Sequence, residues 1–176
     1  VHAFKWPDPD EHDWEDFREQ VRRIPGDRAV RCGVYEPFLE YCAMRGMEQA
    51  MMDLYVAPDV AEAALGRLFD YHYRLNERMF GIGKGRIDIT YVAEDLGCQT
   101  GLLMGLDVIR RFLLPNQKRM ADLARGCGIH IFYHTDGAAR AEKSQAVDLS
   151  GGVRVALEQR AARQLVEHEH DVGATH

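Results

Sequence analysis

Apolar residues along this chain follow two patterns with different periods. Three short runs, at residues 29–35, 87–93 and 129–133, have the length and composition of strands. The segments between them carry apolar residues at spacings of three and four, which is typical of helices with one buried face. This alternation predicts an α/β fold with a parallel sheet and right-handed crossovers.

The clearest helical pattern begins at Pro58. Its buried face is expected to consist of Ala61, Leu65, Leu68, His72, Leu75 and Met79. His72 lies within this stripe, so packing between helix and sheet is its simplest role. A helix interrupted by Gly46 is expected before this one, and a helix kinked or restarted at Pro115 after it.

The composition of the chain changes after residue 137. All sixteen aromatic residues lie in the first 137 positions, and residues 138–176 contain none. We therefore divide the chain into a domain at residues 1–140 and a tail at residues 141–176. The tail is expected to be a loosely attached helix or a disordered end.

The overall composition narrows the class of protein. Of the 176 residues 46% are hydrophobic and 28% charged, as in ordinary globular domains, and the net charge is −6. No basic patch indicates nucleic-acid binding, and no apolar run approaches the ~20 residues of a membrane span. The four cysteines are scattered without paired spacing, which favours a reducing compartment and a cytoplasmic location.

Ionisable side chains follow directly after two of the expected strands. Glu94 and Asp95 come after the run at residues 87–93. In parallel α/β folds the ligand binds at the carboxyl ends of the strands. Asp95 is therefore a candidate general acid/base, and the adjacent Glu94 a candidate substrate contact that would raise its pKa. The alternative for Asp95 is a helix cap or a surface turn.

His134 and Asp136 follow the third run, two positions apart. Alternate residues of a strand point to the same side, so the pair suits joint metal ligation or an imidazole oriented by a carboxylate. The alternative is a buried histidine hydrogen-bonded to a neighbouring strand. Gln99 and Tyr41 are further candidates for substrate binding, with a solvated loop and the apolar core as their alternatives.

A series of short motifs resembles the uroporphyrinogen decarboxylase family. They are residues 4–10 (Phe-Lys-Trp-Pro-Asp-Pro-Asp), 45–48 (Arg-Gly-Met-Glu), 94–99 (Glu-Asp-Leu-Gly-Cys-Gln) and 134–137 (His-Thr-Asp-Gly), together with Pro115. The similarity covers about residues 1–137 and is greatest to the methyltransferase-related and uncharacterised branches. It implies a (β/α)₈ barrel, here a partial TIM barrel, with its pocket at the carboxyl ends of the strands.

The resemblance implies two enzymatic alternatives, both acting on a small molecule. The leading one is a decarboxylase acting on a tetrapyrrole or a related substrate, without a required cofactor, in which Asp95, His134 and Asp136 are catalytic. The second is a corrinoid-linked or thiol methyltransferase, with zinc bound by His134 and Asp136. Methyltransferase members bind zinc through His-x-Cys and a later cysteine. This chain has Asp136 in place of that cysteine and none after Cys127, so a thiolate zinc site is not expected.

A third alternative is a non-catalytic half-barrel. A complete barrel needs ~250 residues, and the family pattern ends near Arg140. We expect a fragment, from a truncated or frameshifted gene, with little activity by itself. An incomplete sheet also predicts association with a second copy or with a partner such as a corrinoid protein.

Overall fold

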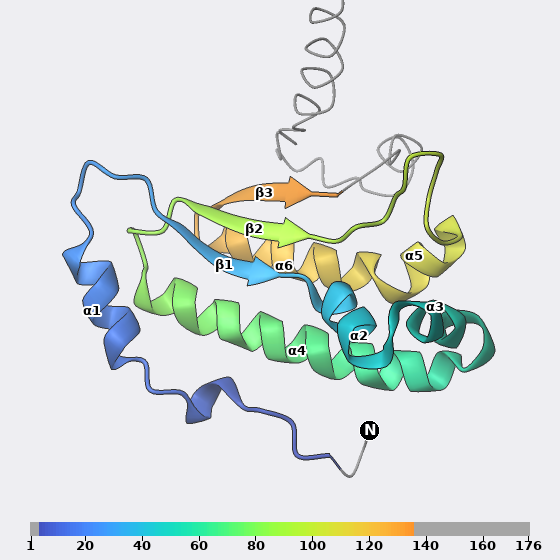
Figure 1. The fold of residues 1–176 in the computed structure, drawn as a ribbon. Helices are drawn as coiled ribbons and strands as arrows, with labels where there is room; N and C mark the ends of the chain where they lie inside the picture. Colours follow the sequence, from blue (N-terminus) through green and yellow to red (C-terminus); the bar gives the residue numbers. More distant parts are fainter. Residues whose placement is uncertain (1–3, 136–176) are drawn as a thin grey trace, which may run out of the picture.

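The computed structural model describes residues 4–135 of the chain. Its centre is a parallel sheet of three strands, β1 (Arg31–Tyr35), β2 (Ile89–Ala93) and β3 (His130–His134), in the order β1-β2-β3 (Figure 1). The three apolar runs are therefore strands, and the prediction that neighbouring runs pair in parallel is confirmed. The boundary drawn between residues 140 and 141 lies outside the described residues.

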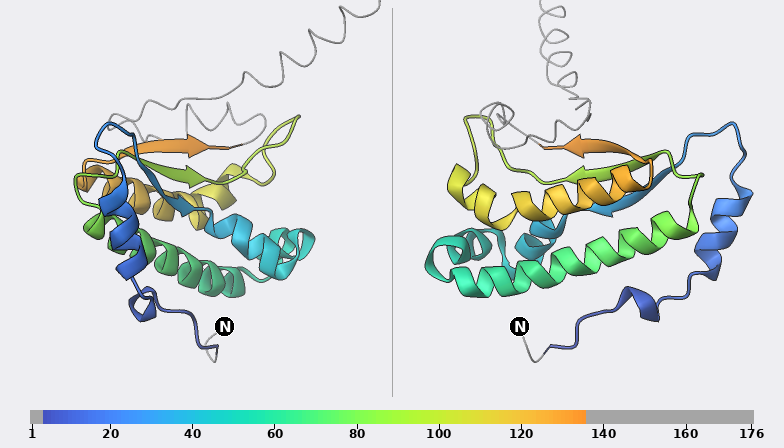
Figure 2. Two further views of the ribbon diagram at one scale, coloured as in Figure 1. Left: turned by 60° about the vertical axis from the view of Figure 1, so that its left-hand side comes forward. Right: turned by 180° about the vertical axis from the view of Figure 1, so that it is seen from behind.

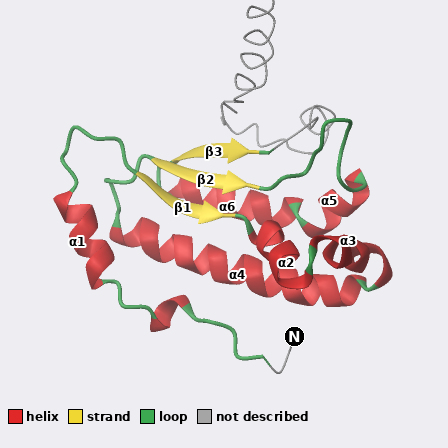
Figure 3. Cartoon of the chain, viewed as in Figure 1, coloured by secondary structure: helices red, strands yellow, loops and turns green. Residues whose placement is uncertain are grey.

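The helices cover one face of this sheet, as Figures 2 and 3 show. In the described residues they are η1 (Pro9–Glu11), α1 (Glu15–Arg23), α2 (Pro37–Arg45), α3 (Met47–Val56), α4 (Pro58–Ile82), α5 (Leu106–Phe112) and α6 (Leu114–Gly126). The long helices α4 and α6 run beneath the strands, whereas α2, α3 and α5 gather at the end to which the strands point (Figure 1). Each strand is thus joined to the next through helices on the same face.

Two breaks in the helices are located where the sequence predicts them. Gly46 separates α2 from α3 and adopts a φ of 86°, which a residue with a Cβ rarely tolerates. Pro115 lies in the first turn of α6, so it restarts the helix after α5 and does not kink a continuous one. The first break turns the chain so that α3 can pack beside α2 at the end of the sheet.

The two faces of the sheet differ in how far they are covered. Val92 of β2 is buried in the core on the helical side. On the other face the rings of Tyr91 and Phe132 stack at 5.6 Å, and the guanidinium of Arg31 lies 5.3 Å from the Tyr91 ring centroid. These aromatic side chains are half-buried, and no helix of the described residues covers that face (Figure 2).

A close approach between β1 and α4 fixes the position of the long helix. Gly33 has a φ of 86°, and a Cβ added there would lie 2.1 Å from Asn76 Oδ1 and 2.9 Å from Thr90 Oγ1. Asn76 is fully buried, and its side-chain amide donates to the His72 carbonyl at 2.8 Å. Glycine at residue 33 therefore lets α4 pack directly on the sheet.

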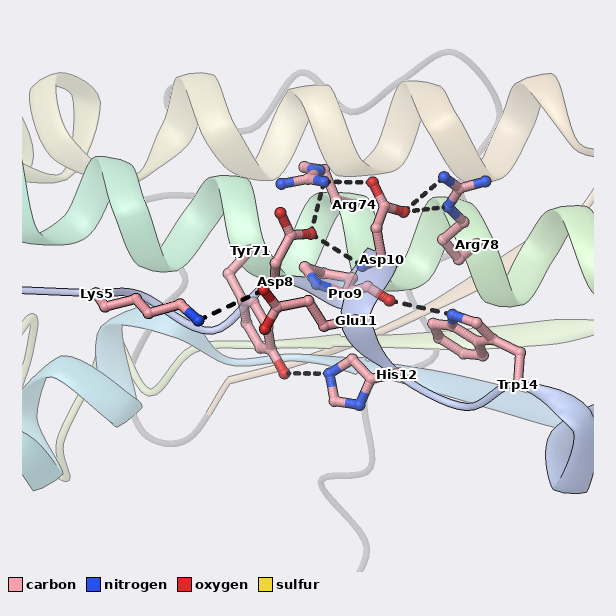
Figure 4. A network of polar contacts seen from close by, with 10 residues as sticks. All are labelled: Lys5, Asp8, Pro9, Asp10, Glu11, His12, Trp14, Tyr71, Arg74 and Arg78. Atoms are coloured by element: carbon pink, nitrogen blue, oxygen red, sulfur yellow. Dashed lines mark hydrogen bonds and ion pairs between the residues drawn. The ribbon is translucent and has the colours of Figure 1, made fainter.

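The amino-terminal segment is held along α4 by charged side chains (Figure 4). Arg74 donates to the carboxylates of Asp8 and Asp10, both at 2.7 Å, and Arg78 Nε donates to Asp10 at 2.7 Å. The Arg78 and Arg74 guanidinium groups hold the pKa of Asp10 below its ordinary value. The Trp14 indole donates to the Pro9 carbonyl at 3.1 Å and closes the turn.

Within residues 4–135 no helix is both long enough and apolar enough to cross a lipid bilayer.

Candidate functional site

Asp95 and His134 lie together at the carboxyl end of the sheet. His134 is the last residue of β3, and Asp95 comes two residues after the end of the neighbouring strand β2. His134 Nε2 is 3.8 Å from Asp95 Oδ1. Both side chains are about two-fifths exposed, at 41% and 38%, and the His134 ring stacks on Tyr91. The parallel pairing of β2 with β3 thus brings these two side chains to the same end of the sheet.

Glu94 points away from this pair, into the helical layer. Its side chain is buried, and it accepts the backbone N–H groups of Phe38 at 3.0 Å and Leu39 at 3.2 Å. These are unpaired donors in the first turn of α2, so Glu94 caps that helix from a neighbouring strand. Burial raises the pKa of Glu94 to about 8, against the opposing effect of the two N–H groups. Its observed contacts are structural.

A cavity of about 400 Å³ opens beside Asp95, between α2, α3 and the loop after β2. Its lining residues are Phe38, Leu39, Cys42, Met47, Met51, Asp95, Gly97, Cys98, Gln99 and Leu103. The Leu96 N–H donates to Thr135 Oγ1 at 3.1 Å, and the Cys98 N–H donates to the Gly101 carbonyl at 2.7 Å. These bonds hold the loop at the ends of the strands. In that position the Asp95 side chain lines the cavity and also lies 3.8 Å from His134.

The structure places some of the predicted site residues at the cavity and others away from it. Asp95 and Gln99 line the cavity, whereas His134 is not among its lining residues and lies 3.8 Å from Asp95. Tyr41 is not among the lining residues; it is buried in the core, and its hydroxyl donates to Asp53 Oδ2 at 2.8 Å. Tyr41 therefore matches the core alternative in its position. Asp136 lies outside the described residues, so its predicted role as a catalytic residue and metal ligand stays a prediction.

The sequence pattern does not identify the sulfur-bearing side chains that line the cavity. Cys42, Met47, Met51 and Cys98 come from three segments and line the same space. The spacing of four between Met47 and Met51 places them on one helix face, which is typical of core packing, but in the structure that face borders the cavity. The spacing alone does not reveal which helix face meets a loop.

The two cysteine thiols of the cavity differ in acidity. A hydrogen bond with the Thr100 hydroxyl, supported by backbone N–H groups, lowers the pKa of the Cys98 thiol. Burial raises the pKa of the Cys42 thiol to about 11. Cys98 is therefore the more readily ionised of the two, and it lies on the same loop as Asp95 and Gln99.

The described residues do not fit a zinc site. Within residues 4–135 no group of three or more His, Cys, Asp or Glu side chains is placed to hold a metal ion. His134 and Asp95 supply two such groups, whereas structural and catalytic zinc sites use three or four protein ligands. Among the described residues that line the cavity there is no lysine or arginine, and the charged one is Asp95.

Comparisons with known proteins give a likeness of fold. No protein-family model matches the chain, and no curated protein matches it. Among solved structures, a methyltransferase from Methanosarcina mazei is similar, with a TM-score of 0.54 and 18% sequence identity. The match covers 68% of this chain and 33% of that one, so the chain spans about a third of the methyltransferase's length. At this identity the likeness concerns the fold.

Proposed function

We propose that this chain forms part of a methyltransferase, built on a (β/α)₈ barrel, that acts on a small thiol. The observation that carries the proposal is the pairing of Asp95 with His134 at 3.8 Å beside a sulfur-lined cavity. The pair of Asp95 and His134 lies at the carboxyl ends of the strands, where ligands bind in (β/α)₈ barrels. The likeness of this fold to a methyltransferase supports the same function.

The lining of the cavity suits the reactants of thiol methylation. Thiols, thioethers and methyl groups are apolar and polarisable, and the thioethers of Met47 and Met51 provide a wall of the same character. Asp95 and Gln99 supply the polar groups that would orient the other end of the substrate. A cavity of about 400 Å³ is within the range of small-molecule sites.

His134 is the proposed base. Its imidazole can accept a proton from a thiol, and the Asp95 carboxylate, 3.8 Å away, would stabilise the imidazolium formed. The sulfur then attacks the methyl carbon, the new S–C bond forms, and the electron pair of the broken bond stays with the donor. A corrinoid partner, when bound, would supply the methyl group. The proposal assigns no metal ion to the described residues of this chain.

The decarboxylase alternative is supported by one feature, the carboxylate of Asp95 in a cavity, which can accept pyrrole N–H groups. A tetrapyrrole substrate of that family also carries several carboxylates, and these require cationic partners. Within residues 4–135 no lysine or arginine lines the cavity. The distribution of charge therefore favours the methyltransferase proposal.

Binding and turnover on the 176-residue chain test the proposal. The probes are 2-mercaptoethanol with methylcobalamin, and uroporphyrinogen as the competing substrate. We expect saturable shifts of the amide NMR signals of residues 95–103 with the thiol, and methyl transfer above the rate without protein. His134→Gln should lower that rate about tenfold or more. His130→Gln, on an exposed position at the start of β3, is the matched control and should not.

The same measurements distinguish the methyltransferase from the decarboxylase. Binding of uroporphyrinogen at residues 95–103, without binding of the thiol, would favour the decarboxylase. Shifts that spread over the whole sheet, or equal rates for the two histidine variants, would contradict a role for the pair of Asp95 and His134.

A further inference from the structure

The exposed apolar side chains of this chain are concentrated at one end of the fold. Of nine exposed large hydrophobic residues in the described part of the chain, eight lie on α2, α3, the first turn of α4 or the loop before α5. These eight form what we call the apolar patch: Leu39, Met44, Met47, Met52, Tyr55, Val56, Val60 and Leu103. Large contiguous apolar patches are rare on the surfaces of monomeric proteins, and they commonly mark interaction sites.

Helix α3 is apolar on two faces, which explains the patch. One face buries Ala50 and Leu54 in the core. The opposite face carries Met52, Tyr55 and Val56, at spacings of three and four, with exposed fractions of 47%, 58% and 68%. A helix that only covers the core needs one apolar face, and within residues 4–135 the second face stays exposed.

The patch is continuous with the candidate site. Leu39, Met47 and Leu103 both line the cavity and belong to the exposed set. The Tyr55 hydroxyl accepts the backbone N–H of Gly105 at 3.1 Å, which ties α3 to the loop before α5. A molecule seated on the patch would therefore lie beside the mouth of the cavity.

The charges around the patch determine which occupant fits. Between residues 44 and 60 the only cation is Arg45, which donates to Asp53 at 2.7 Å. Glu48 and Asp59 are exposed, and no ion pair within the described residues involves either. Along α3 and the first turn of α4 the patch thus has an unneutralised acidic margin, which complements an apolar surface bordered by lysine or arginine.

A second copy of this chain fits the same surface poorly. A two-fold axis through the patch would bring its own acidic margin opposite itself. Glu48 and Asp59 of both copies would then approach one another, and like charges across an interface oppose association.

We propose that the apolar patch is the docking surface for a different protein, one that presents apolar side chains within a basic margin. Methionine and tyrosine are enriched at the centres of such interfaces, and methionine side chains adapt to the shape of a partner. The proposal goes beyond methyl transfer, because it rests on the exposed surface and is tested by binding.

A pair of synthetic helical peptides tests the proposal on the full chain. Both carry leucine at positions i, i+3, i+4 and i+7, and the remaining positions are lysine in one and glutamate in the other. We expect the lysine peptide to bind about tenfold more tightly or better, by fluorescence anisotropy, and to weaken as salt is raised from about 50 to 300 mM. Equal binding of the two peptides would overturn the proposal.

Two double variants locate the binding surface. Met52→Gln with Val56→Gln removes apolar area without touching a cavity-lining residue, and should weaken the lysine peptide about tenfold. Glu48→Lys with Asp59→Lys should reverse the preference between the peptides. Asp16→Lys with Asp27→Lys changes the net charge equally at exposed positions remote in the sequence, and should preserve the preference. Circular dichroism and thermal melting confirm that each variant folds.

The remaining outcomes also decide the proposal. Unchanged binding by the Met52→Gln, Val56→Gln variant would overturn it. Sedimentation velocity showing a dimer that this variant abolishes would assign the patch to a second copy. Patch-dependent binding to vesicles of phosphatidylcholine and phosphatidylglycerol would assign it to a membrane.

Discussion

The backbone N–H of Phe38 in the first turn of α2 donates to the buried carboxylate of Glu94, 56 residues further along the chain, at 3.0 Å. Leu39 donates to the other oxygen of the same carboxylate at 3.2 Å. Glu36, at the N-cap position, makes no side-chain capping bond. The end of β2 thus fixes the start of α2, and two of the cavity-lining residues are positioned by this contact.

Replacing Glu94 with alanine should destabilise the fold without altering the chemistry of Asp95. Two helix N–H groups would lose their acceptor in a buried place, at a cost of about 2–4 kcal/mol in the free energy of unfolding. Glu94→Gln keeps an acceptor oxygen and should cost less. Urea denaturation of the three proteins at pH 6 measures the difference; equal stability would show that the capping contact is energetically neutral.

The same carboxyl group should make stability depend on pH. Burial raises the pKa of Glu94 in the folded chain to about 8, from an ordinary value of 4.5. The folded state binds this proton more tightly than the unfolded state does. Protonated Glu94 therefore contributes its full share of the free energy of unfolding below about pH 4.5, and that share is lost as the pH rises to about 8. Glu94→Gln carries no charge, so it should gain stability relative to the wild type between pH 5 and pH 8.5. A constant difference over that range would contradict the raised pKa.

Asp53 should show the opposite dependence on pH. Arg45, Gln49 and Tyr41 all donate to this carboxylate, at 2.7, 2.8 and 2.8 Å. Hydrogen bonds from Arg45, Gln49 and Tyr41 hold the pKa of Asp53 well below its usual value of 3.8. The stability it provides is present above about pH 4 and is lost as the pH falls further.

We therefore expect Asp53→Asn to be less stable than the wild type at pH 6, and the gap to narrow as the pH is lowered from 5 to 2. Acid denaturation followed by circular dichroism measures both proteins. Asp122→Asn, at an exposed ion pair with Lys118, is the control and should change the curve little. A gap that widens toward low pH would contradict the assignment.

Gly33 should not tolerate a side chain. Alanine there would adopt an unfavourable positive φ, and its Cβ would meet Asn76 Oδ1 at 2.1 Å. We expect Gly33→Ala to lower the free energy of unfolding by about 2–4 kcal/mol. Gly26→Ala is the control, because it has open space around it and no positive φ. Thermal melting compares the two, and similar midpoints would show that α4 can move away from the sheet.

Substitution of Asp95 should mainly affect the rate of methyl transfer, whereas substitution of His72 should mainly affect stability. Asp95→Asn removes the negative charge beside His134, so it should reduce methyl transfer far more than it changes the melting temperature. His72 is mostly buried in α4, and its Nε2 contacts the Glu40 carboxylate of α2. His72→Leu removes that link and should cost about 1 kcal/mol in stability. It should leave the rate per folded molecule unchanged; a greater loss of rate than with Asp95→Asn would contradict both roles.

The helices and strands and their order along the chain can be predicted from the pattern of apolar residues. Apolar alternation at residues 87–93 and 129–133 and the stripe beginning at Ala61 express local periodicities, which depend on neighbours in the chain. From them followed the parallel pairing, because strands joined by helices on one face must run the same way. That pairing in turn placed Asp95 near His134.

The contacts of each polar residue at the strand ends depend on how the elements pack in three dimensions. Glu94 and Asp95 are adjacent in sequence, yet one caps α2 in the core and the other lines the cavity, because successive residues leave the strand on opposite faces. Tyr41 meets Asp53, and Met47 and Met51 border the cavity, because the break at Gly46 folds α3 back beside α2. Such contacts join residues from separate segments, and a one-dimensional pattern carries no information about the distance between them.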